Sequence, residues 1–188
     1  MIDTTSPSIS ELALTADQIA KATRHLAVTR DALVESVTGF SPLQWGFRPT
    51  FDSWSIAEIL EHLALMEGRI HIIIGNMCSA PEAELTGKQI EMDEVILNEV
   101  PKRSTKLKAP EPVCPAGRWS GDEALQCFLT SRERTMQLLA FPLLRGRVRP
   151  HPLFGPWDGY QWLLATGSHT ARHTDQIREI KADVHFPG

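Results

Sequence analysis

Apolar residues recur three, four or seven positions apart in four long segments, which is the spacing of amphipathic α-helices. The four segments cover about residues 10–37, 55–77, 120–142 and 160–182. No segment alternates apolar and polar residues with the period of two that a half-buried strand requires. The pattern therefore predicts an all-α protein.

Local signals support the helix boundaries. Ser55 to Glu58 and Ser120 to Glu123 each have the form of a capping box, in which a hydroxyl and a carboxylate satisfy the first free backbone amides of a helix. Ser41 and Pro42 predict one further short helix, which reaches Trp45. Each of these helices thus has a chemical reason to begin where the periodicity begins.

Two segments interrupt the helices. Residues 79–119 contain five prolines, and only 92–100 keep helical spacing, which predicts a long crossover with one short helix. Residues 145–159 are rich in proline and glycine, and we expect them to be irregular. Four long helices with one long crossover between the second and third predict a four-helix bundle.

Length and composition limit the possibilities. The chain has 188 residues, 42% of them hydrophobic and 22% charged, which suits one globular domain spanning 1–188. Its formal net charge of −4 provides no positive field for a phosphate backbone, so nucleic acid is not an expected partner.

The expected location is the cytoplasm. Cys78, Cys114 and Cys127 are odd in number and never spaced as C-x-x-C, which predicts neither a disulfide framework nor a cysteine zinc site. The N-terminal residues 1–6 lack the positive and apolar regions of a signal peptide. No apolar run approaches the roughly 20 residues of a membrane span, so we expect no membrane partner.

Two histidines in the fourth helix are the strongest chemical signal. His169 and His173 are one turn apart, on the face that also carries Trp162 and Ile180, so their rings can converge on one cation. The alternative is that both are partly buried histidines bonded to the backbone or to Gln176. Thr170 stands where the H-E-x-x-H motif has its glutamate, which disfavours a zincin-type peptidase.

A third ligand has to come from another helix. His62 lies at the edge of the apolar stripe of the second helix, although a boundary histidine bonded to a neighbour would show the same pattern. Glu58 fits the helix cap better than a partner of His62. His151 either borders the site or lies in a surface loop. Three histidines with a fourth position open are typical of catalytic metal sites.

These residues resemble the DinB-like family of four-helix-bundle metalloproteins. The resemblance covers nearly the whole chain after Ser41, and two segments carry most of it: W-S-x-x-E-x-x-x-H-L, residues 54–63, and H-x-x-x-H-x-x-Q-I, residues 169–177. Further matching segments are Leu43-Gln44-Trp45, Arg118-Trp119-Ser120 and His151-Pro152-Leu153-Phe154-Gly155. Trp54 and Trp119 are expected to pack at helix starts.

The resemblance implies that His62, His169 and His173 hold a divalent metal ion, nickel or zinc, in an open site. It further implies an S-transferase that activates a low-molecular-weight thiol such as bacillithiol, mycothiol or glutathione toward an electrophile, and a homodimer. The alternatives are a metal-dependent hydrolase and a non-catalytic stress protein that binds a metal or a small ligand. Gln176 is expected to accept a hydrogen bond from a histidine or to pack between helices.

Overall fold

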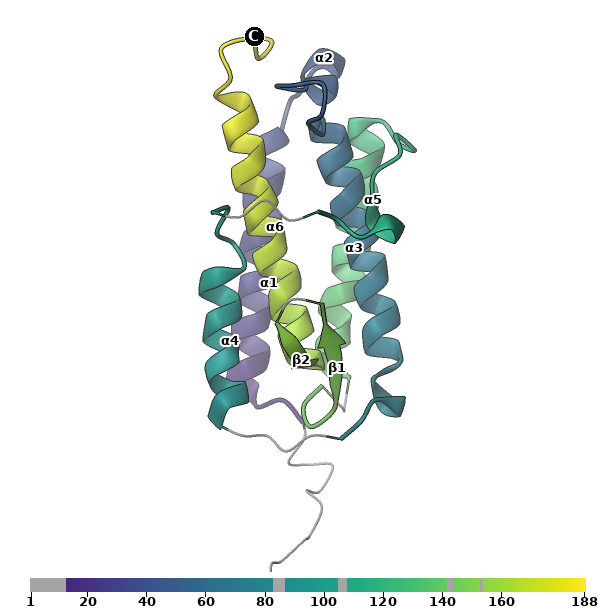
Figure 1. The fold of residues 1–188 in the computed structure, drawn as a ribbon, viewed down its shortest axis with the longest axis vertical. Coiled ribbons are helices and arrows are strands. Elements are labelled where there is room, and N and C mark those ends of the chain that lie inside the picture. The colour runs from purple at the N-terminus through teal and green to yellow at the C-terminus, as the bar shows by residue number, and fades with distance from the viewer. Residues whose placement is uncertain (1–12, 83–86, 105–107, 142–143, 153) are drawn as a thin grey trace, which may run out of the picture.

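Four long helices form a bundle, as the sequence predicts (Figure 1). The computed structural model describes residues 13–82, 87–104, 108–141, 144–152 and 154–188. The helices are α1 (Ala16–Val37), α2 (Pro42–Gly46), α3 (Ile56–Gly75), α4 (Gly87–Glu99), α5 (Gly121–Gln137) and α6 (Gly159–Lys181). The strands are β1 (Val148–His151) and β2 (Gly155–Asp158).

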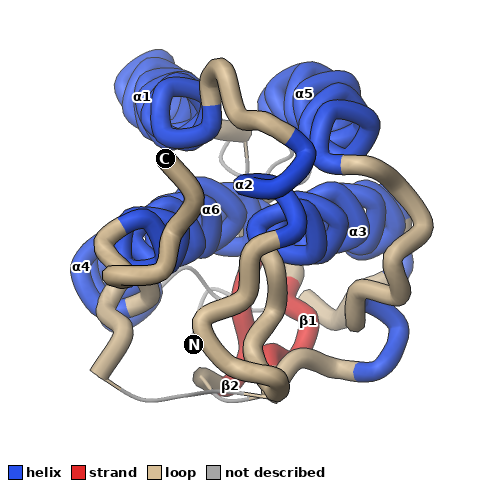
Figure 2. The backbone as a smooth tube through the Cα atoms, turned by 90° about the horizontal axis from the view of Figure 1, so that it is seen from above, coloured by secondary structure: helices blue, strands red, loops and turns tan. Residues whose placement is uncertain are grey.

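The arrangement of the helices brings α3 and α6 side by side. Helix α1 packs against α5 and α6, and α3 packs against the same two helices, so α1 and α3 lie across the bundle from each other (Figure 2). Helix α4 belongs to the predicted crossover and packs on α6 outside the bundle. It begins five residues before the predicted segment, at Gly87.

Both predicted capping boxes are confirmed. In the first, the Glu58 amide donates to the Ser55 hydroxyl at 3.3 Å and the Ser55 amide donates to the Glu58 carboxylate at 2.8 Å. Ser120 and Glu123 form the same pair of bonds. The Glu58 carboxylate therefore caps the start of α3, and it also forms an ion pair with Arg48.

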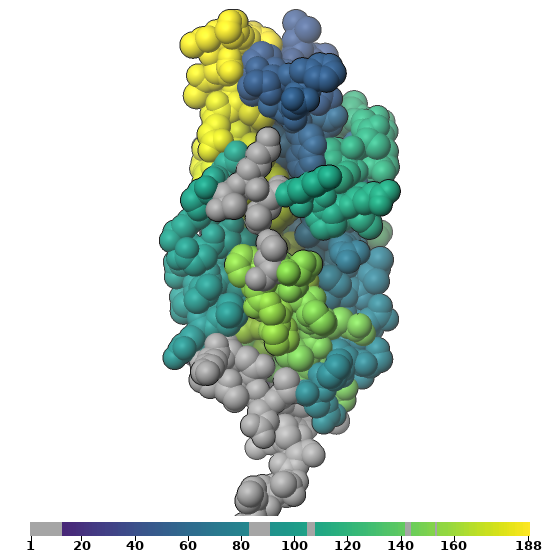
Figure 3. Space-filling view, in the orientation of Figure 1, coloured from purple at the N-terminus to yellow at the C-terminus, as the bar shows by residue number. Residues whose placement is uncertain are grey.

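The expectation of an irregular segment at 145–159 is wrong, because β1 and β2 form an antiparallel hairpin there. In its register Pro150 faces Pro156. Neither residue has a backbone N–H, so this pair cannot exchange hydrogen bonds, and the prolines occupy a position where the ladder does not need them. Figure 3 shows the hairpin filling the face of the molecule between α4 and α3.

The hairpin makes stability sensitive to acid. The His151 ring stacks on Trp157 with centroids 3.9 Å apart, and burial lowers the pKa of His151 to about 4. Between pH 6.5 and about 4 the unfolded chain binds a proton that the folded protein does not, so the free energy of unfolding falls as the pH falls. We expect His151→Phe, which keeps an aromatic ring, to lose less stability than the wild type between pH 7.5 and 4.5 in urea unfolding. Parallel losses in the two proteins would contradict this.

Gly121 is required by close packing at the start of α5. A Cβ at this position would overlap the indole ring of the buried Trp45. We expect Gly121→Ala to lower the free energy of unfolding by about 1–3 kcal/mol, measured by urea unfolding. Gly68→Ala is the matched control: a Cβ there meets nothing within 4 Å, so the same change inside α3 should stabilise by about 0.5–1 kcal/mol.

Some expectations concern residues outside the described ranges. These are the N-terminal segment 1–6, the predicted helix start at Ser10, Pro142 and Leu153. Within the described part, α1 begins at Ala16 with Thr15 as its N-cap. No helix among the described residues is both long enough and apolar enough to cross a membrane.

Candidate metal centre

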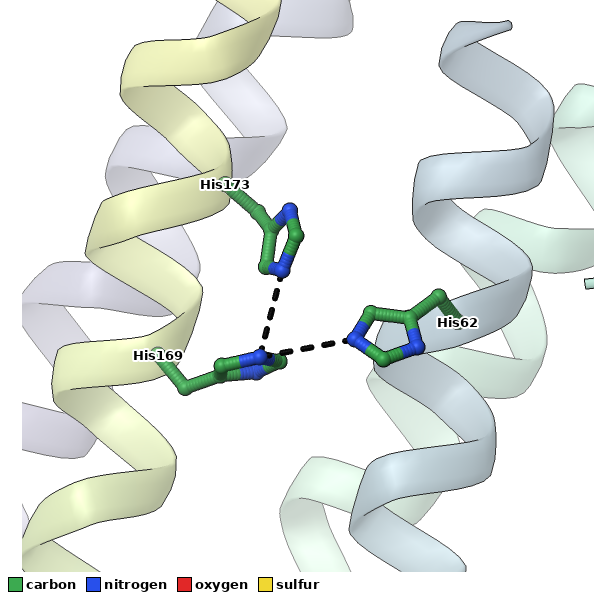
Figure 4. A group of neighbouring side chains, drawn as sticks. All are labelled: His62, His169 and His173. Carbon is green, nitrogen blue, oxygen red and sulfur yellow. Dashed lines mark hydrogen bonds between the residues drawn. The ribbon is translucent and has the colours of Figure 1, made fainter. Parts of the chain in front are cut away.

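Three histidines meet between α3 and α6. His62 is supplied by α3, and His169 and His173 stand one turn apart on α6 (Figure 4). One ring nitrogen from each lies within 4.8 Å of the other two. His62 and His173 are buried, and His169 is partly buried. The structure thus brings together all three histidines that the sequence singled out.

Hydrogen bonds at the far side of two rings determine where their lone pairs point. His62 Nδ1 lies 2.7 Å from the Val113 carbonyl oxygen, and His173 Nδ1 lies 2.8 Å from Gln176 Oε1. Both oxygens can only accept, so each Nδ1 carries the proton and each Nε2 carries a lone pair. Both lone pairs belong to the nitrogens that face His169. The expected role of Gln176 as an acceptor from a histidine agrees with this contact.

The spacing of the Nε2 atoms suits a bound cation. His169 Nε2 lies 3.1 Å from His173 Nε2 and 3.4 Å from His62 Nε2. Two nitrogens bound at about 2.0–2.1 Å to one tetrahedral ion lie about 3.3 Å apart. His169 can donate one proton to only one of its two neighbours, so hydrogen bonds alone leave a lone pair unmatched, whereas a divalent cation would satisfy all three. The residues therefore fit a metal ion.

Burial keeps these imidazoles neutral. Burial lowers the pKa of His62. Burial, together with the nearby His173 and His62 rings, lowers the pKa of His169 well below its usual value. Burial and the nearby His62 lower the pKa of His173 to about 3. Neutral imidazole is the form that binds metal, so protons compete weakly for this site at neutral pH.

Trp54 lies against the histidines, which the sequence did not reveal. Its ring is 4.9 Å from the His62 ring and 6.4 Å from the His173 ring, nearly parallel to the latter. The expected packing role at the start of α3 is therefore incomplete, since this indole also forms an apolar wall of the site. Trp119 packs, partly buried, against the apolar cluster of Trp45 and Phe128.

A buried carboxylate stands next to His62 in sequence but serves a different structure. The side chain of Glu61 is 1% exposed and accepts hydrogen bonds from the Ala116 amide at 2.9 Å and the Arg118 amide at 3.1 Å. The Arg118 guanidinium also pairs with it. Burial raises the pKa of Glu61, but these three donors outweigh it and lower that pKa below its usual range. No sequence signal indicated this contact.

Gln176 is itself held in place. Arg103 donates to Gln176 Oε1 at 3.3 Å and binds both carboxylate oxygens of Glu179 at 2.9 and 2.8 Å. The guanidinium therefore confirms that the oxygen of the Gln176 amide faces His173. His151 does not belong to the histidine group, because its ring packs against Trp157 of the hairpin and Trp162 of α6.

Comparisons with known proteins identify the family and the fold of the chain. The chain is 27% identical over 166 residues to the uncharacterized protein YuaE of Bacillus subtilis, an alignment that covers 85% of this chain and 98% of that protein. Its fold is similar to that of YfiT from Bacillus subtilis, described as a probable metal-dependent hydrolase with an unusual four-helix bundle topology. That match has a TM-score of 0.53 and 15% identity and covers 96% of this chain and 93% of YfiT. The model of the DinB superfamily matches residues 25–177, and the chain therefore belongs to the DinB superfamily.

Proposed function

We propose that this protein is a metal-dependent enzyme that works at His62, His169 and His173, with hydrolysis as its leading reaction. The observation that carries the proposal is that one ring nitrogen of each histidine lies within 4.8 Å of the other two. The description of YfiT, a protein of similar fold, as a probable metal-dependent hydrolase supports hydrolysis. Nickel and zinc, the metals that the family resemblance implies, are the proposed ions, and imidazole nitrogen is a suitable ligand for both.

Two kinds of side chain have separate roles in this proposal: the histidines would bind the metal ion, and Trp54 would shield it from solvent. A divalent ion held there would lower the pKa of a coordinated water or thiol and so supply a nucleophile at neutral pH. His62, His169 and His173 would hold that ion through their ring nitrogens, and three protein ligands are typical of catalytic rather than structural zinc sites. Trp54 presents an apolar surface beside His62 and His173, which would exclude bulk water and pack against the substrate.

One observation favours thiol transfer as the second candidate. A hydrolase commonly uses a carboxylate base to activate water. The carboxylate next to His62, that of Glu61, is occupied by Ala116 and Arg118. A thiol is already much more acidic than water, so it needs only the cation, and the S-transferase predicted from sequence uses the same three histidines.

The test compares the two reactions on one preparation. Protein purified without chelator is analysed for metal by mass spectrometry, then stripped and reloaded with Ni²⁺ or Zn²⁺. Activated esters and amides are assayed without thiol, and monochlorobimane is assayed with bacillithiol, mycothiol or glutathione. Metal-dependent turnover without thiol supports hydrolysis, and turnover only with thiol supports transfer. Failure to bind any divalent metal tightly would overturn both.

A further inference from the structure

The loop that follows the short 3₁₀ turn Glu111–Val113 is attached to α3 by one carboxylate. Glu61 accepts from the backbone amides of both Ala116 and Arg118. Gly117, between them, has φ +69°, a left-handed conformation that other residues rarely adopt. This turn lets two nearby amides point at one anion, the arrangement of a backbone nest. The carboxylate and the turn thus fit each other.

The 3₁₀ turn that leads into this loop supplies the hydrogen-bond acceptor of His62. Val113 is 2% exposed, and its carbonyl oxygen lies 2.7 Å from His62 Nδ1. Glu61 and His62 are adjacent on α3, so Val113 and the Ala116–Arg118 turn are both bonded to the same turn of one helix. The contact of Val113 with His62 and the attachment at Glu61 therefore lie on one short stretch of chain.

We propose that Glu61 is a positioning residue that keeps His62 in the Nδ1–H form, with its Nε2 lone pair directed at the metal site. The inference rests on the proposed metal-binding role of His62. Glu61 acts through the loop: it holds the Ala116–Arg118 turn, the turn holds Val113, and the Val113 carbonyl accepts the Nδ1 proton. Outer partners of this kind fix the tautomer and orientation of a metal-binding histidine.

Two substitutions separate this role from general stabilisation. Glu61→Gln keeps the shape of the side chain but turns one acceptor oxygen into an NH₂ group that faces a backbone N–H. Gly117→Ala leaves Glu61 in place and strains the turn instead. Glu58→Gln is the matched control, because Glu58 is on the same helix and its carboxylate bonds Ser55 and Arg48 instead of this loop.

The readout is the tautomer of His62, observed by ¹⁵N NMR of histidine-labelled, metal-free protein, together with Zn²⁺ affinity from competition with a chromophoric chelator. We expect Glu61→Gln and Gly117→Ala to populate the Nε2–H form of His62 and to weaken Zn²⁺ binding by about 10–100-fold. Glu58→Gln should keep the wild-type tautomer and affinity.

Each failure has its own signature. If Glu61→Gln and Gly117→Ala both keep the wild-type tautomer and affinity, or if Glu58→Gln changes them equally, the positioning role is wrong. If the wild type binds no Zn²⁺, the proposed function fails, whereas the tautomer comparison in metal-free protein still decides the role of Glu61. If Glu61→Gln does not fold, Gly117→Ala decides it.

Discussion

Replacing His169 with alanine is expected to weaken binding of Zn²⁺ or Ni²⁺ by more than about 100-fold and to abolish any metal-dependent turnover. His169 Nε2 is the atom that contacts both other Nε2 atoms, at 3.1 and 3.4 Å. Its removal leaves two ligands, and the loss must exceed the roughly 10–100-fold that removal of an outer partner costs. Isothermal titration of metal-free protein measures the change.

His185→Ala is the control for this experiment. The His185 side chain is 84% exposed and bonds Asp183 in the C-terminal tail, so its loss removes a histidine without touching the site. Metal affinity should remain at the wild-type value. Equal affinities in His169→Ala and wild type would place the metal elsewhere and remove the basis of the proposed function.

Replacing Arg132 with methionine is expected to lower the free energy of unfolding by about 3–5 kcal/mol, the largest effect predicted for stability. Arg132 on α5 is fully buried and binds Glu67 on α3, with Nε 2.7 Å from the carboxylate. It also donates to the Leu26 carbonyl on α1 and to the Thr170 hydroxyl on α6, at 2.9 and 2.7 Å. The substitution leaves the Glu67 carboxylate buried without its cation.

Chemical denaturation of Arg132→Met, Glu67→Met and the double variant measures the coupling between the two residues. The double variant should lose less stability than the sum of the single losses, because it leaves no buried charge without its counter-ion. The exposed pair of Arg178 and Asp175 provides the control, and Arg178→Met should cost less than about 1 kcal/mol. Strict additivity of the buried pair would contradict the prediction.

Local patterns predicted most of the helices. The capping boxes at Ser55 and Ser120 operate within four residues, so the sequence displays both partners. The pairing of His169 with His173 is local in the same sense, because one helical turn brings them together. The hairpin at 145–159 escaped prediction because its prolines suggested irregular chain, whereas the register places Pro150 opposite Pro156.

Only the tertiary structure could reveal the surroundings of the site. The hydrogen-bond partner of His62 is the backbone carbonyl of Val113. Every residue type has a backbone carbonyl, so the sequence contains no signal for this contact. Glu61 reaches amides 55 and 57 positions away, and Trp54, which lies just before α3, reaches His173 on α6. Such contacts depend on how the crossover lies against α3, which short-range periodicity does not encode.

The sequence by itself determined most of the helical segments, the caps at Ser55 and Ser120 and the placement of His169 and His173 one turn apart, because each follows from chemistry between near neighbours along the chain. The tertiary structure decided that α3 lies beside α6, so that His62 meets His169 and His173, and that a distant loop holds His62 in one tautomer. The physical reason is that packing joins residues whose separation along the chain carries no periodic signal.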